Sequence, residues 1–251
     1  MKLFFGTRQK QYLFILAEPR SGSTWLTETL NSHPQVRLLG ELLNPKLFPE
    51  VAVFPGLNRE RLSEPLQYLD RKLKKTGVRY PGCKILLNHL NQISPDFLGL
   101  ILATYPTAHY LFLTRKNLVK SLVSVKIAEQ SDRWHLHPGE EHPLTPIHID
   151  PAWLKDRLKQ RQLLRTRMAS QLAASGCRQM KIAYEDLFDN REDTIRQISE
   201  FLHLPGQDIR FSRKIKSTPT NLEKIIANYA DVCRALQGEP EYYSMLTSQH
   251  L

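Results

Sequence analysis

Cysteine is scarce in this sequence, with three in 251 residues. Cys83, Cys177 and Cys233 lie far apart, and none of them belongs to a C-x-x-C pair. This spacing indicates neither a disulfide framework nor a zinc site built on cysteine. We therefore expect a protein of the reducing cytoplasm.

Long apolar runs are also lacking. No stretch reaches the roughly 18 apolar residues of a membrane-spanning helix, and the opening MKLFFGTRQK turns polar before a secretory apolar segment could form. We expect a soluble protein with no membrane span and no export signal. With 41% hydrophobic residues, a chain of 251 can bury a proper core, and we expect one domain over residues 1–251.

Acidic residues are outnumbered, because 25 Asp and Glu stand against 35 Lys and Arg and give a formal net charge of +10. Such a balance favours an anionic partner. Nucleic acid is not the expected partner, since no zinc-finger or RNP signature accompanies the charge and the basic residues are spread along the chain. A small molecule with several phosphate groups satisfies the same charge.

Apolar runs typical of strands alternate with helical patterns through most of the chain. The clearest runs are residues 12–17, 83–90, 109–115 and 179–185, and each precedes a segment with helical spacing. Near-continuous apolar strands between helices are typical of a parallel sheet covered on both faces. The sequence therefore predicts an α/β protein.

A long basic helix is predicted over residues 151–174. Apolar residues recur there at helical spacing among many Arg and Lys, and Ser175-Gly176 is a normal helix stop. We interpret the basic residues of this segment as the solvated face of a packed helix.

The first apolar run ends in the turn EPRSGSTW, residues 18–25. In an open α/β sheet, ligands bind where strands end, and a strand-to-helix turn directs backbone N–H groups outward. The glycine frees the backbone, the hydroxyls can donate hydrogen bonds, and the arginine matches phosphate or sulfate oxygens. The turn predicts an oxyanion site, with a serine-rich helix cap as the alternative. The G-x-x-x-x-G-K-[ST] motif is missing, which argues against ordinary ATP or GTP hydrolysis.

The segment PRSGSTWL closely resembles the 5′-phosphosulfate loop of sulfotransferases that use 3′-phosphoadenosine 5′-phosphosulfate (PAPS). The resemblance extends from about residue 12 to about residue 240. It implies a three-layer α/β/α fold with a central parallel sheet, related in architecture to P-loop kinases. It also implies that the sulfated end of the donor is held by Arg20, Ser21, Gly22, Ser23, Thr24 and Trp25.

A second segment, YLFLTRKNLVKSLVS, resembles the part of the family that binds the 3′-phosphate of the donor. The family uses an Arg at a strand end and a Ser in the following helix. Arg115 and Ser124 fit the spacing in bacterial carbohydrate sulfotransferases of the trehalose-sulfating and nodulation-factor type, while Ser121 fits a second alignment. A guanidinium and a hydroxyl in these places can close on one phosphate dianion.

Two residues are candidates for the base that removes the acceptor proton. Glu41, in VRLLGELLNP, resembles the catalytic Glu of the bacterial carbohydrate enzymes. His89, in KILLNHLNQ, resembles the catalytic His of cytosolic sulfotransferases, whose Lys-Thr-His-Leu segment ends a strand, but the Lys-Thr pair is replaced here. The spacing favours Glu41. Lys84, near the start of the strand expected to hold His89, is either a sheet-edge charge or a group near the transferring sulfuryl.

Later segments resemble the family more loosely. Tyr184-Glu185-Asp186-Leu187 stands in the family's late strand and helix, where we interpret it as architecture. A weaker resemblance to the C-terminal part of the family implies that three basic side chains lie near donor phosphate, namely Arg213, Lys214 and Lys216.

Residues 131–150 hold three Pro and four His without a clear period. We expect a loop that folds over the acceptor. The four histidines, His135, His137, His142 and His148, have no nearby Cys, so no metal site is expected.

Together these features predict a PAPS-dependent sulfotransferase that leaves adenosine 3′,5′-bisphosphate as product and needs no metal. The acceptor would offer a hydroxyl, or an amine, on a carbohydrate or small natural product. A nucleotide-dependent kinase and a non-catalytic nucleic-acid-binding protein are the alternatives.

Overall fold

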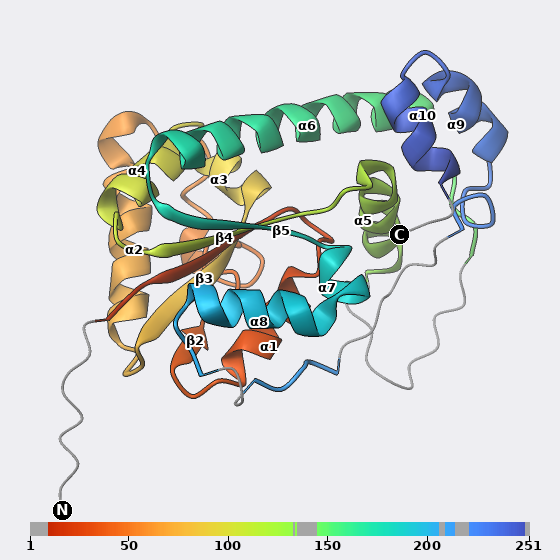
Figure 1. Ribbon diagram of the computed structural model, residues 1–251. Helices are drawn as coiled ribbons and strands as arrows, with labels where there is room; N and C mark the ends of the chain where they lie inside the picture. Colours follow the sequence, from red (N-terminus) through yellow and green to blue (C-terminus); the bar gives the residue numbers. More distant parts are fainter. Residues whose placement is uncertain (1–9, 133, 135–144, 206–208, 214–220, 249–251) are drawn as a thin grey trace, which may run out of the picture.

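A five-stranded parallel sheet forms the centre of the protein, with the strand order β2-β3-β1-β4-β5 (Figure 1). The computed structural model describes residues 10–132, 134, 145–205, 209–213 and 221–248. The strands are β1 (Leu13–Ala17), β2 (Val36–Leu38), β3 (Tyr80–Leu86), β4 (His109–Thr114) and β5 (Arg178–Ala183). Every residue of β1, in the middle of the sheet, is buried, as expected of a strand covered on both faces.

Helices cover both faces of the sheet (Figure 1). Side chains such as Phe14 and Tyr110 pack on one face against α2 (Ser63–Lys74), α3 (Leu87–Ile93), α4 (Phe97–Thr104) and α6 (Pro151–Ala174). Side chains such as Ile15 and Leu111 pack on the other face against α1 (Ser23–Asn31), α7 (Asp186–Asp189) and α8 (Arg191–Phe201). The predicted three-layer α/β/α architecture with a parallel sheet is confirmed.

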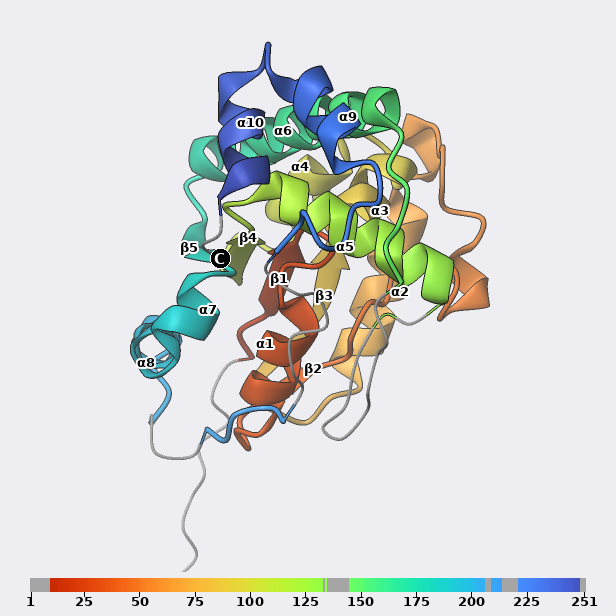
Figure 2. The same cartoon turned by 90° about the vertical axis from the view of Figure 1, so that its right-hand side faces the viewer.

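A third apolar cluster lies beside the sheet, where α5 (Leu118–Ser131) and the first half of α6 meet α9 (Tyr229–Leu236) and α10 (Pro240–Thr247) (Figure 2). An isolated parallel bridge joins Ile147 to Ile226, and the Asn228 side chain bonds both backbone groups of Ile149. Two short 3₁₀ turns, Pro49–Val51 and Arg59–Arg61, connect β2 to α2.

The prediction of a strand over residues 83–90 was wrong at both ends. β3 already begins at Tyr80, and the chain turns helical at Leu87. Leu87, Leu90 and Ile93 are buried at helical spacing, and a short apolar run does not distinguish that pattern from a strand. His89 therefore lies in a helix and not at a strand end.

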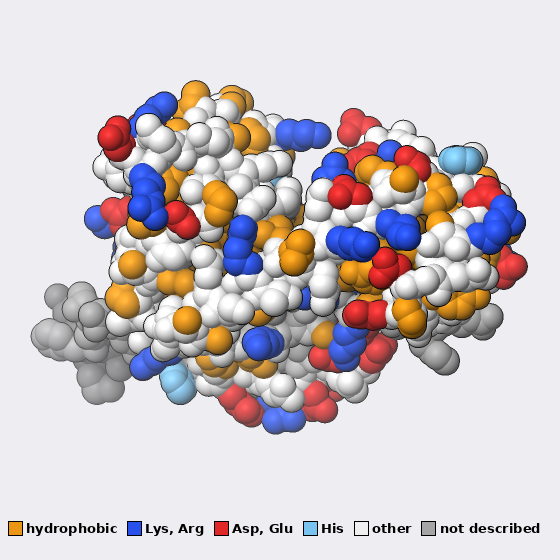
Figure 3. Space-filling model, turned by 90° about the horizontal axis from the view of Figure 1, so that it is seen from above, with side chains coloured by type: hydrophobic (Ala, Val, Ile, Leu, Met, Phe, Trp, Pro, Cys, Tyr) orange, Lys and Arg blue, Asp and Glu red, His pale blue; other side chains and the backbone are white. Residues whose placement is uncertain are grey.

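The basic helix was predicted correctly as α6, which spans Pro151–Ala174. The Asp150 side chain accepts a hydrogen bond from the Ala152 N–H at its start, and Gly176 follows its end with φ 64°. Figure 3 views the molecule from the side of α6, where basic side chains are scattered among acidic and hydrophobic ones and the outline is notched between two lobes. No helix in the described part of the chain has the length and apolar character needed to cross a membrane.

Candidate active site

The carboxyl ends of three strands meet where the sequence predicts the anion site. Ala17, the last residue of β1, pairs with Leu86 of β3 on one side and with Leu113 of β4 on the other. The turn after β1 and Arg115 after β4 are therefore neighbours at this edge of the sheet. This is the edge at which open α/β sheets bind their ligands.

The backbone of the turn takes an unusual shape. Arg20 has φ 62° and Gly22 has φ 77°, and α1 begins directly afterwards at Ser23. The Ser21 hydroxyl, which is buried, donates to the Glu18 carbonyl at 2.6 Å and holds the turn closed from inside. The N-cap residue of α1 is Gly22, which has no side chain to cap the helix, so the N–H groups and the dipole of the first turn suit an anion.

Gly22→Ala is expected to destabilise this turn. A left-handed conformation costs an alanine about 1–2 kcal/mol, and the added Cβ would meet the Tyr184 Cδ2 at 3.1 Å. For a chain of this size we expect Tm to fall by about 2–8 °C in thermal unfolding. Gly99→Ala in α4, whose added Cβ meets nothing within 4 Å, is the matched control and should leave Tm unchanged or raise it. Equal behaviour of the two variants would contradict the strain assigned to Gly22.

Arg115 and Ser124, predicted to act together, are joined through Arg20. The Arg20 Nε donates to the Ser124 hydroxyl at 2.8 Å, and the Arg115 guanidinium donates to the Arg20 carbonyl at 3.3 Å. Arg20 also donates to the Trp134 carbonyl. The guanidinium of Arg20 thus lies against α5, between the two parts of the predicted donor site.

Arg115 is held in place although it is a buried charge, with only 3% of its surface exposed. Its guanidinium lies 4.4 Å from the centre of the Tyr184 ring, a cation–π contact. Its Nε is buried, and within the described residues it has no hydrogen-bond partner. Burial lowers the pKa of Arg115, and burial together with Arg115 lowers the pKa of Arg20 to about 10. An anion placed beside these two adjacent arginines would offset their mutual repulsion and the cost of burying their charge.

The hydroxyl of Ser121, the alternative to Ser124, makes two hydrogen bonds within the protein. It donates to the Pro19 carbonyl at 3.1 Å and accepts from Arg161 at 2.7 Å. Ser121 therefore supports the turn from α5.

The candidate base Glu41 lies in a polar cluster with Lys84. The Lys84 ammonium is 2.7 Å from a Glu41 carboxylate oxygen and donates to the Thr24 hydroxyl at 2.9 Å. The Asn44 amide donates to the other Glu41 oxygen at 2.7 Å. Burial opposes ionisation of Glu41, but the charge and hydrogen bonds of Lys84 and Asn44, with His89 nearby, hold its pKa below the ordinary value.

His89, from α3, lies near the cluster of Glu41 and Lys84. Burial lowers its pKa; the nearby Glu41 raises it, and Lys84 lowers it further. Its Nδ1 is buried and, in the described part of the chain, has no hydrogen-bond partner. Lys84 is not at the start of its strand as expected, since it pairs with Ile15 inside β3. The cluster therefore brings Glu41, His89 and Lys84 together beside Thr24.

Trp25 lies at the other side of the turn, where its indole N–H donates to the Ser212 carbonyl at 3.1 Å. Its ring stacks with Phe211 at 5.9 Å between centroids. Residues 209–213 therefore run beside α1. Arg213 is exposed there, while Lys214 and Lys216 lie outside the described residues.

The predicted histidine-rich loop is only partly described. His148 is exposed, and His135, His137 and His142 lie outside the described residues. Over the ranges that the structure describes, no group of three or more His, Cys, Asp or Glu is placed to hold a metal ion.

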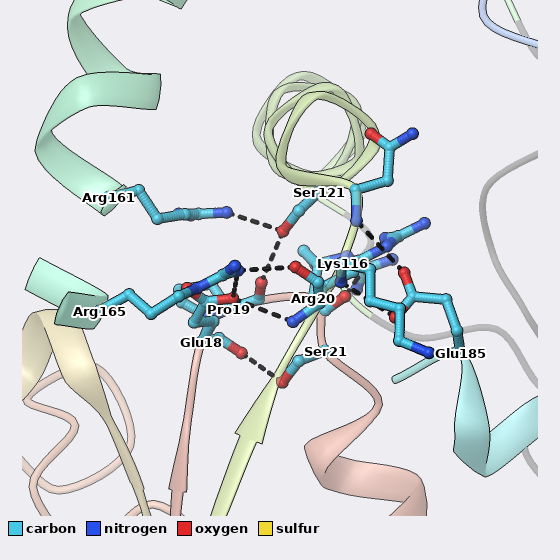
Figure 4. A network of polar contacts seen from close by, with 11 residues as sticks. Glu18, Pro19, Arg20, Ser21, Lys116, Ser121, Arg161, Arg165 and Glu185 are labelled. Atoms are coloured by element: carbon cyan, nitrogen blue, oxygen red, sulfur yellow. Dashed lines mark hydrogen bonds and ion pairs between the residues drawn. The ribbon is translucent and has the colours of Figure 1, made fainter. Parts of the chain in front are cut away.

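Three residues at the site were missed from the sequence. Glu18, Arg161 and Arg165 form polar contacts around the turn, as Figure 4 shows. The two arginines come from α6, where they were interpreted as part of a solvated face. Their spacing could have indicated that they point inward, because they continue the apolar stripe of that helix.

A parallel sheet whose first strand ends in a tight turn and leads directly into a helix defines an α/β protein with its candidate site at the strand ends. Residues 12–208 match the family model described as the sulfotransferase family. The chain belongs to the sulfotransferase family.

Curated relatives agree with this assignment over most of the chain. Nodulation protein H of Rhizobium meliloti (strain 1021) is 26% identical over 232 residues, which cover 90% of this chain and 92% of that protein. Nodulation protein H of Rhizobium tropici is also 26% identical, over 90% of this chain and 89% of that protein. An uncharacterized protein of Aquifex aeolicus (strain VF5) is 25% identical over 81% of this chain. The matched part is only 27% of the length of the Aquifex protein.

Among solved structures, the sulfotransferase domain from the Synechococcus PCC 7002 olefin synthase resembles this chain with a TM-score of 0.51 and 16% identity. The likeness covers 80% of this chain and 75% of that one. It supports the fold alone, and the fold is the P-loop-like sulfotransferase fold that the sequence predicts.

Proposed function

We propose that the protein transfers the sulfuryl group of PAPS to a hydroxyl, or an amine, of a carbohydrate or small natural-product acceptor. The cluster of Arg20, Arg115 and Ser124 at the ends of β1 and β4 carries this proposal. The cluster is cationic, Arg115 and Ser124 in it are buried, and it adjoins the N-terminus of α1, so it suits a ligand with two anionic ends.

The donor would lie across the strand ends in one orientation. The turn from Arg20 to Trp25 would hold the 5′-phosphosulfate, because its backbone amides and the hydroxyls of Ser23 and Thr24 lie at the start of α1. Arg115 and Ser124 would hold the 3′-phosphate, with Arg20 between the two anionic groups. The family membership supports PAPS as donor and adenosine 3′,5′-bisphosphate as product.

The transfer itself needs a base and charge stabilisation. Glu41 would take the proton of the acceptor hydroxyl, whose oxygen forms a bond to sulfur as the bond from sulfur to the leaving phosphate oxygen breaks. Lys84 has three N–H donors, of which Glu41 and Thr24 use two, and the third would donate to an oxygen of the transferring group. The arginines and Lys84 supply the positive charge, so the proposed step uses no metal.

The proposed acceptor is a carbohydrate or small natural product. Similarity to nodulation protein H covers nine-tenths of both chains and agrees with the nodulation-factor-type spacing of Arg115 and Ser124. Incubation with PAPS and a panel of hydroxyl compounds, followed by mass spectrometry for added sulfate, would identify the acceptor class.

Binding of the spent donor tests the function directly. At about 100 times its Kd, a ligand of the folded state stabilises it by about 2.7 kcal/mol. For a chain of this size, adenosine 3′,5′-bisphosphate should therefore raise Tm by about 5–10 °C in a thermal-shift assay. A shift with ATP and Mg²⁺ alone would favour a kinase instead. Salt-sensitive nucleic-acid binding undisturbed by the bisphosphate would favour a nucleic-acid-binding protein.

A further inference from the structure

Helix α6 buries one stripe of side chains along its length. Four members of the stripe are apolar and fully buried: Leu154, Leu158, Met168 and Leu172. Spacing by three and four residues leaves two positions of the same stripe between them, and these positions are Arg161 and Arg165. α6 thus directs two charged side chains inward at the point where it crosses the strand ends (Figure 4).

Arg165 makes a forked contact with Glu18. Its Nε lies 2.8 Å from one carboxylate oxygen of Glu18, and one of its terminal nitrogens lies 2.6 Å from the other oxygen. The same terminal nitrogen donates to the Arg115 carbonyl at 2.6 Å. A bidentate pair of this kind fixes direction as well as distance.

Glu18 connects this contact to the donor site. Only 1% of its surface is exposed, and its carboxylate also accepts the backbone N–H of Arg115 at 3.1 Å. Its own carbonyl accepts the Ser21 hydroxyl. Glu18 and Arg165 together therefore hold the end of β1, the turn and the backbone of Arg115 in one arrangement.

Arg161 supports the neighbouring residue of the turn. It donates to the Ser121 hydroxyl, which in turn donates to the Pro19 carbonyl (Figure 4). Burial, with Arg165 and Arg115 nearby, lowers the pKa of Arg161 to about 10, although Glu18 acts in the opposite sense. The two inward arginines of α6 thus hold the two residues directly before Arg20: Arg165 binds Glu18, and Arg161 acts on Pro19 through Ser121.

Stability alone does not account for charges at these positions. A buried ion pair is often no more stabilising than apolar side chains of similar size, and the stripe is apolar on both sides. A leucine would pack at position 165 but could not orient a carboxylate toward the backbone of Arg115. The distinctive property of the pair is its directional geometry.

We infer that Arg165 is a positioning residue of the donor site: acting through Glu18, it holds Arg115 and the turn at residues 18–22 in the arrangement that binds the donor. Arg161 supports the same turn through Ser121. This inference rests on the proposed function.

The experiment measures the Kd of adenosine 3′,5′-bisphosphate by calorimetry, together with Tm, for the full chain. The variants are Glu18→Gln, Arg165→Met and the double variant, in which no buried charge of the pair is left alone. Each single variant should weaken binding about tenfold or more, and the double variant no more than the worse single variant, because coupled residues are not additive. The Tm of the double variant should stay near that of the wild type.

A matched control is Arg157→Gln, an exposed arginine of the same helix, which should keep the wild-type Kd. Arg165→Lys keeps the charge without the fork and should bind with intermediate affinity; it decides the question if the other variants do not fold. Unchanged Kd in the double variant or in Arg165→Lys overturns the inference, and so do additive losses. Absence of bisphosphate binding by the wild type would instead refute the proposed function itself.

Discussion

Arg115→Ala is expected to weaken the binding of adenosine 3′,5′-bisphosphate by about 100-fold or more. Arg115 is buried, its Nε has no partner within the described residues, and its guanidinium is oriented by Tyr184 and the Arg20 carbonyl. Hydrogen bonds to charged groups contribute about 1.5–3 kcal/mol each, and about 2.7 kcal/mol corresponds to this change in Kd. Isothermal calorimetry of the purified variant measures the loss.

Lys116→Ala is the matched control for Arg115→Ala. Lys116 is the next residue, but its side chain is exposed and its ammonium pairs with the Asp186 carboxylate at 2.9 Å. Its removal should leave the Kd within about twofold, since exposed ion pairs contribute little. If Arg115→Ala keeps wild-type affinity while its Tm is normal, the assignment of the 3′-phosphate to Arg115 is wrong.

Glu41→Gln is expected to lower turnover by about two to four orders of magnitude while donor binding is kept, because general-base catalysis contributes on this scale. The amide preserves the shape of the side chain and its hydrogen bond with Lys84, but it accepts no proton. Single-turnover kinetics with PAPS and an identified acceptor measure the effect, and bisphosphate affinity measures donor binding separately.

His89→Gln distinguishes the two candidate bases. A base works only when deprotonated, so kcat/KM falls as pH drops through its pKa. The pKa of Glu41 is lowered, which places that fall below about pH 4.3, whereas the lowered pKa of His89 places it below about pH 6.5. Turnover that survives His89→Gln supports Glu41. Loss of turnover in His89→Gln alone would reverse the assignment.

The donor turn could be predicted from the sequence because its chemistry is local. Arg20 to Trp25 follow one buried strand and open one helix, so their residue types and their structure are read from the same segment. Arg115 follows another strand, and the parallel sheet brings the two strand ends together. Strand periodicity and turn composition were sufficient to predict where the turn and Arg115 lie, while their role in donor binding stays a prediction.

The contact between Lys84 and Glu41 could not be predicted in the same way. It depends on the pairing of the three-residue β2 with β3, where Leu38 lies opposite Gly82, and on the short turn from Leu38 to Glu41. A strand this short has almost no periodicity to detect. The lysine was consequently read as a strand-start residue, and its bridge from Thr24 to Glu41 became apparent only with the sheet assembled.

The inward arginines of α6 were misread for a different reason. The helix and its bounds follow from apolar spacing, but Arg and Lys are exposed in most helices, which made the solvated face the simpler interpretation. What turns Arg165 inward is a carboxylate 147 positions earlier in the chain, and no local pattern contains that information.

This long separation between Glu18 and Arg165 has a consequence for synthesis of the protein. The fingerprint of the donor turn leaves the ribosome early, but the side chain that secures it is translated much later. Truncated or nascent chains that stop before α6 would carry the recognisable motif without the means to hold its shape. In a pulse-labelling experiment, newly made chains would then bind immobilised adenosine 3′,5′-bisphosphate only after most of the polypeptide has been synthesised.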